Sequence, residues 1–186
     1  MKTKFDINQL IKRGVIKNEI ELERASLAER KLRVLAKQSP ELGLKRKKLR
    51  ELIYSYEEKN WTNRKKITKS QLNESDNAEI LVQKELEFIE LRKKLIKSKL
   101  KRLGLNQQEF GKILGHDSKS YMSELMNGVV PFSLKDLIII SKLLKINLNK
   151  LIPTQIPESE KNKIEKTIND LGKPKLKLNK KEFAII

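Results

Sequence analysis

The residues best suited to chemistry lie together in one short segment of the sequence, residues 118–128. Its apolar residues share one face of a helix: Met122, Leu125 and Met126. The opposite face keeps small or polar side chains, namely Lys119, Ser120, Tyr121, Ser123 and Asn127. The major groove of DNA admits a single helix, whose first turns read base edges through hydrogen-bond donors and acceptors. The segment therefore predicts a DNA-reading helix, with a plain helical hairpin as the simpler alternative.

A second short helix is expected just upstream. Asn106 and Glu109 have the spacing of a capping box, and Gly115 can end the helix. We expect its core face to carry Phe110, Ile113 and Leu114. Gly111 lies inside this helix, where glycine costs ~1 kcal/mol relative to alanine. Such a cost predicts that another helix approaches closely at this position.

Residue types needed for catalysis or zinc binding are scarce. The chain has no cysteine and one histidine, His116. His116 lies in the expected turn, and we expect it to have no functional role. Zinc sites and cysteine nucleophiles are excluded, which leaves only a carboxylate metal site conceivable. Glu57-Glu58-Lys59 has the acid-x-lysine spacing of some nucleases, but nothing nearby completes a site. We expect no enzyme, no cofactor and no metal.

The net charge of +18 suits a polyanionic partner such as DNA, RNA or an anionic membrane surface. Lysine far outnumbers arginine, and a coding bias of an AT-rich genome would produce part of the same excess. The densest basic block is residues 92–102, with seven cations and no acid. It predicts a basic helix face beside the two short helices.

The remaining sequence predicts further helices. Asp6 and Gly14 bound a short first helix. Two apolar stripes predict a helical hairpin over residues 16–61: Ala25, Ala28, Leu32 and Leu35, then Leu49, Leu52, Ile53 and Tyr56. Residues 62–78 are polar and aperiodic and predict a linker. A helix is expected from about Glu79, and its buried face should carry Phe88, Leu91, Leu95 and Leu103.

The chain beyond Pro153 is polar and rich in lysine. A modest helix is expected at about 158–171, and residues 175–186 alternate like an edge strand or like a peptide that binds a partner. No apolar run is long enough to span a bilayer, and the N-terminus lacks the apolar core of a secretion signal. We therefore expect a cytoplasmic protein that does not insert into a membrane.

Residues 105–110, Gly115-His116 and 120–128 have the composition and spacing of a known domain. Residues 89–153 resemble the Xre/Cro-type helix-turn-helix domain, which has five helices. The resemblance implies helices at 79–103, 106–114, 118–127, 133–145 and 147–152. Segments 118–128 and 131–134 are most similar to HigA-type antitoxins of type II toxin–antitoxin systems. Ile16–Glu19 and Leu52–Lys59 resemble the N-terminal hairpin of that family.

The resemblance implies an all-α chain in four parts. These are an N-terminal helical hairpin for toxin binding or oligomerisation (1–61), a linker (62–78), a helix-turn-helix domain (79–153) and a basic extension (154–186). At matching positions Gln107 and Asn127 would contact phosphates, while Lys119, Ser120, Tyr121 and Ser123 would face bases. Val129-Val130 stands where many relatives are basic. We expect Lys94, Lys97 and Lys101 to compensate.

The function implied is a transcriptional repressor that binds a double-stranded DNA operator as a homodimer. As in HigA-type antitoxins, it would also neutralise an mRNA-cleaving toxin of the HigB type. One alternative is a stand-alone phage-type Xre repressor without a toxin. Another is a basic helical protein that lies on RNA or on a membrane surface. A small basic toxin encoded next to the gene would favour the antitoxin.

Overall fold

The computed structural model of the chain describes residues 5–63, 67–153, 156–173 and 176. Over these residues it is all-helical, as the sequence predicts. The N-terminal helices are α1 (Ile7–Arg13), α2 (Glu19–Leu35) and α3 (Pro40–Trp61), with the 3-10 turn η1 (Ala36–Gln38). They are followed by α4 (Lys69–Arg102), α5 (Gln107–Leu114), α6 (Lys119–Asn127), α7 (Leu134–Leu144), the 3-10 turn η3 (Leu148–Lys150) and α8 (Glu158–Asp170).

The helices α1, α2 and α3 form one unit, which we call the N-terminal unit. Asn18 begins α2 by accepting a hydrogen bond from the backbone N–H of Glu21, at 2.9 Å. The α2 stripe predicted from the sequence is buried, and it packs on α3. Tyr56 of α3 donates its hydroxyl to Glu19 Oε1 of α2, at 2.8 Å. The predicted hairpin is confirmed.

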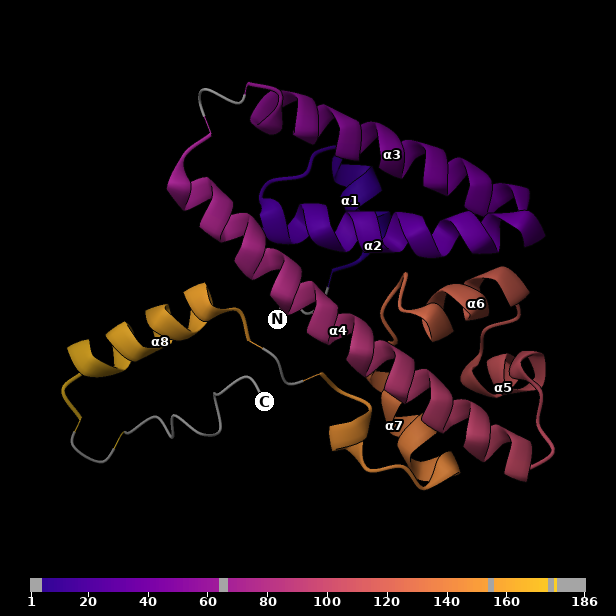
Figure 1. Cartoon of the computed structure of the whole chain (residues 1–186). Helices are drawn as coiled ribbons and strands as arrows, with labels where there is room; N and C mark the ends of the chain where they lie inside the picture. Colours follow the sequence, from indigo (N-terminus) through magenta and orange to yellow (C-terminus); the bar gives the residue numbers. More distant parts are fainter. Residues whose placement is uncertain (1–4, 64–66, 154–155, 174–175, 177–186) are drawn as a thin grey trace.

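Helix α4 connects the two halves of the molecule (Figure 1). Its 34 residues span about 51 Å, at 1.5 Å per residue. The first half packs on α2, and Arg24 Nε donates to Glu85 Oε2 across that contact, at 2.9 Å. The second half packs on α5, α6 and α7 through Ile96 and Leu100. One hydrophobic core therefore runs from the N-terminal unit into the C-terminal helices.

The prediction of a linker over residues 62–78 is wrong for its second part. Helix α4 begins at Lys69, where the Thr68 hydroxyl accepts a hydrogen bond from Gln71 N at 3.2 Å. Ala78 is the single buried residue between Lys69 and Ala78, so this stretch has no apolar periodicity to reveal the helix.

The expected buried face of α4 is wrong at two of its four residues, since Phe88 and Leu95 are partly buried and Leu95 packs against the core. Leu91 and Leu103 are 66% and 53% exposed, and Arg92, Ile96 and Leu100 are buried instead. The Arg92 guanidinium lies 5.5 Å from the ring centre of Phe88 and 5.2 Å from that of Phe132. It donates to the Leu151 carbonyl at 3.2 Å. A cation thus occupies the core position that a hydrophobic pattern gives to leucine, and burial lowers the pKa of Arg92 to about 10.

The predicted C-terminal helix is present as α8, which lies on the other side of α4 from α5 and α6 in Figure 1. The predicted strand-like segment, 175–186, lies outside the described residues apart from Leu176. Among the helices that the structure describes, none is both long and apolar enough to cross a membrane.

Candidate nucleic-acid interface

Helices α5 and α6 follow each other with four residues between them. The Asn106 side chain begins α5 by accepting from the backbone N–H of Glu109, and the Glu109 carboxylate accepts from Asn106 N in return, at 2.9 and 2.8 Å. Gly115 ends α5 in the left-handed conformation, at φ 84°. Ser118 then begins α6 by accepting from Tyr121 N at 3.2 Å. The capping box and both helix ends were predicted from the sequence.

Gly111 makes the tight turn between α5 and α6 possible. A Cβ atom at this position would lie 2.8 Å from the backbone oxygen of His116 and 3.4 Å from Met122 Cγ. The close approach predicted from a mid-helix glycine is confirmed. The expected core position of Ile113 is wrong, because its side chain is 45% exposed.

Four of the predicted site residues form one exposed or partly exposed face of α6, which we call the α6 strip: Lys119, Ser120, Ser123 and Asn127. Three of them recur at intervals of four residues, which places them above one another on the helix. Gln107 Nε2 of α5 donates to Ser123 Oγ at 3.3 Å. The structure therefore joins Gln107 to the α6 strip.

A further cation completes this group. Lys93 Nζ of α4 donates to Asn127 Oδ1 at 2.6 Å, and Asn127 Nδ2 donates to the Ser123 carbonyl at 2.8 Å. In the sequence, Lys93 belongs to the basic block at residues 92–102 and is not among the predicted site residues. The contact between Lys93 and Asn127 depends on how α4 crosses α6, so no local sequence pattern predicts it.

Tyr121 lies off this strip. Its ring packs edge-on against His116, with ring centres 5.1 Å apart and an interplanar angle of 79°. Burial raises the pKa of Tyr121. His116 Nε2 lies 3.1 Å from Asp136 Oδ1, and Asp136 caps α7 by accepting from Ser133 N at 2.9 Å. The histidine that the sequence left without a role thus ties the α5–α6 turn to the start of α7.

The N-terminal unit forms a wall beside the α6 strip. Glu124 of α6 is 2% exposed and forms an ion pair with Lys45 of α3. Burial raises the pKa of Glu124, and Lys45 opposes that shift. One turn before Lys45, Leu42 borders a hollow of about 330 Å³ together with Lys119, Ser120 and Ser123. No local pattern predicts the ion pair between Lys45 and Glu124, because the two residues are 79 positions apart.

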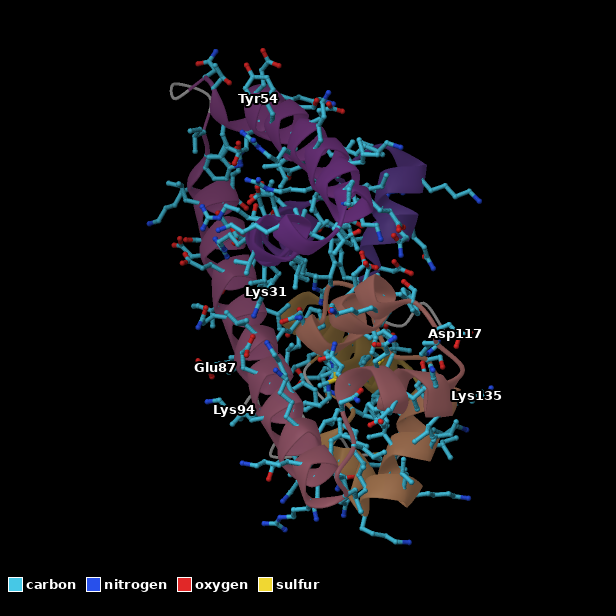
Figure 2. All side chains as sticks on the ribbon, turned by 90° about the vertical axis from the view of Figure 1, so that its right-hand side faces the viewer. Lys31, Tyr54, Glu87, Lys94, Asp117 and Lys135 are labelled. Atoms are coloured by element: carbon cyan, nitrogen blue, oxygen red, sulfur yellow. The ribbon has the colours of Figure 1, made fainter. Side chains whose placement is uncertain are left out.

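The three lysines predicted to contact phosphates are exposed, and their spacing of three and four residues places them on one broad face of α4, with Lys97 at the edge nearest Lys93. In Figure 2, Lys94 lies at the opposite edge of the molecule from Asp117, which belongs to the α5–α6 turn. Lys97 is one turn from Lys93 and interacts with it electrostatically, so it lies nearest to the α6 strip. Val129 and Val130 are buried in the core rather than exposed in place of basic residues.

No cluster of three or more potential metal ligands occurs in the part of the chain that the structure describes. Comparison of the chain with protein-family models, with curated proteins and with solved structures found no match.

Proposed function

We propose that the protein is a sequence-specific DNA-binding regulator in which α5 and α6 form a helix-turn-helix of the Xre/Cro type. The observation that carries the proposal is the α6 strip, a polar face on a short helix that is packed on its other faces. Lys119 at the start of α6 suits the acceptors of guanine, and Ser120 and Ser123 are small enough to let the helix sit deep. Gln107, and Asn127 backed by Lys93, suit phosphate oxygens.

The test is selection of duplexes from a random library, followed by affinity measurements on the selected duplex and on a random one. Lys119→Ala should weaken binding to the selected duplex by ~1–3 kcal/mol and change binding to the random duplex little, because a base contact carries sequence preference. Gln107→Ala should weaken binding to both duplexes by the same factor, because a phosphate contact does not depend on sequence. Lys69→Ala, at the far end of α4 and about 36 Å along the helix from Lys93, is the matched control. Failure to enrich any duplex would contradict the proposal.

We propose a homodimer on DNA, since one short helix covers few base pairs and two half-sites about one helical turn apart would supply specificity. Helix α7 offers a candidate contact, because Leu134 and Ile138 are one turn apart and exposed. Light scattering of the wild type and of Ile138→Glu, with and without the selected duplex, tests this. A monomer bound to a single asymmetric site would contradict it.

A toxin partner of the HigB type is the second candidate function. One observation favours it: the two N-terminal segments that resemble HigA-type antitoxins meet in space, through the hydrogen bond from Tyr56 to Glu19. The test is co-purification with the product of the neighbouring reading frame and rescue of growth when that product is toxic. Absence of both would favour a stand-alone repressor.

A further inference from the structure

A groove between α2 and α3 gathers arginine in a chain that otherwise uses lysine. The sequence holds 33 lysines and nine arginines. Four of the nine arginines line this groove, but only one lysine does. We call it the arginine groove and define it by its cationic and aromatic lining: Arg30, Arg33, Arg46, Lys47, Arg50 and Tyr54. Its volume is about 850 Å³, within the range of small-ligand sites.

Most of the arginines of this groove do not hold α2 against α3. Among the residues that the structure describes, Arg46 is the one groove arginine with an ion pair across the hairpin, to Glu29 at 2.7 Å. Arg33 and Arg50 are exposed and make no hydrogen bond or ion pair with the residues that the structure describes. A lysine would supply charge equally well in this lysine-rich chain. Arginine adds a rigid fork that binds phosphate or carboxylate through two hydrogen bonds, and a flat face that stacks.

Two other lining residues suit a ligand rather than the fold. Gly43 lies inside α3, where glycine costs ~1 kcal/mol relative to alanine. No atom lies within 4 Å of the position that its Cβ would take, so packing does not require glycine there. Its absent side chain leaves the backbone open to close approach. Tyr54 is 66% exposed and its ring is free to stack.

We propose that the arginine groove binds the phosphate groups of a nucleotide while its base stacks on Tyr54. The nucleotide belongs to a single-stranded nucleic acid or is free in solution. Aromatic stacking together with a cationic track is how proteins hold single strands. The lining also contains Glu29, Glu51 and Glu57, which leaves cations in excess and disfavours a basic protein as the occupant. The site lies on the N-terminal unit and does not depend on duplex binding by α6.

The experiment measures fluorescence anisotropy of a short labelled single-stranded RNA, of labelled ATP and of the selected DNA duplex with the full chain. Arg33→Gln with Arg50→Gln should weaken single-strand binding roughly tenfold or more, and Tyr54→Ala by a similar factor. Lys48→Gln removes one charge from the same helix outside the groove and should change binding less than about twofold. Binding of ATP alone would identify a free nucleotide, and binding of RNA alone would identify a strand.

Two further variants distinguish binding at the arginine groove from non-specific attraction to the positive charge of the protein. Arg33→Lys with Arg50→Lys keeps the charge but removes the fork, and it should still lose most of the affinity. Gly43→Met places a helix-favouring side chain in the groove, and it should weaken RNA binding while the protein melts at or above the wild-type temperature. Duplex affinity should be unchanged in all these variants. Equal losses for Lys48→Gln and the arginine variants, or competition by poly-glutamate as strong as by RNA, would overturn the proposal.

Discussion

Replacing Lys45 by methionine should destabilise the whole chain, because it leaves the Glu124 carboxylate buried without a partner. Methionine keeps most of the apolar stem of lysine, so the change mainly removes the charge. Removal of one member of a buried ion pair costs about 3–5 kcal/mol. We expect the lower end, about 3 kcal/mol, since the Lys45 side chain is 15% exposed. In a chain of this size that lowers the melting temperature by roughly 6–12 °C.

The loss should depend on pH in a definite direction. Burial raises the pKa of Glu124 above its ordinary value of 4.5, and removal of Lys45 raises it further. Between 4.5 and this raised pKa the folded chain binds more protons than the unfolded chain, so stability falls as pH rises. The deficit of Lys45→Met should therefore be largest near neutral pH. It should shrink as pH falls toward 4.5, where Glu124 is protonated in the folded state.

Thermal and urea unfolding of four proteins at several pH values provide the assay. Lys45→Met with Glu124→Gln replaces the charge by a neutral amide and should recover most of the lost stability. Lys48→Met, at an exposed position of the same helix, should stay within about 0.5 kcal/mol of the wild type. A Lys45→Met deficit that is absent at neutral pH, or that does not change with pH, would refute the reasoning.

Three further predictions concern the α6 region. Gly111→Ala should lower the free energy of unfolding, measured with urea, by about 1–3 kcal/mol, because the new Cβ would lie 2.8 Å from a backbone oxygen. The Cβ of Gly43→Ala would meet no atom, so this control should raise the free energy of unfolding by about 0.5–1 kcal/mol. His116→Ala loses a hydrogen bond to a buried carboxylate of α7 and should cost about 1–2 kcal/mol; an unchanged melting curve would contradict this. On duplex DNA, Lys97→Gln should flatten the slope of log affinity against log salt by about 0.9, and Lys94→Gln should not change it.

The local features of α5 and α6 were predictable because short-range rules produce them. The capping box at Asn106 requires only Glu109, three residues later. The free-energy cost of glycine inside a helix indicates a close approach at Gly111 even when the approaching residue is not known. The spacing of Lys119, Ser123 and Asn127 places them on one face whatever surrounds the helix. Each of these inferences uses residues no more than eight positions apart in the sequence.

The features that were missed depend on distant partners. Arg92 is buried because Phe132 and the Leu151 carbonyl meet it from other elements, and no pattern within α4 indicates this. The start of α4 at Lys69 has no apolar stripe of its own, and Gln71 Nε2 ties it to the Asn60 carbonyl at the end of α3, at 2.9 Å. In the sequence, Glu124 looks like an ordinary exposed glutamate of α6, but in the structure it is buried against Lys45. Sequence periodicity reports how apolar a face is, and it cannot report a charge that a distant partner makes tolerable in the core.

The wall beside the α6 strip links the two proposed sites. Leu42 and Lys45 contact the α6 side, and Gly43 and Arg46, between and beside them on the same helix, line the arginine groove. A ligand in the arginine groove changes the affinity for duplex DNA only if the ligand has different affinities for two states of the protein. In one state α3 packs on α6, and in the other it does not. The two affinities must then shift by the same factor, whichever ligand is added first. Measuring duplex affinity with and without saturating single-stranded RNA yields that factor. Lys45→Met should reduce it, because the variant removes the ion pair through which α3 holds α6.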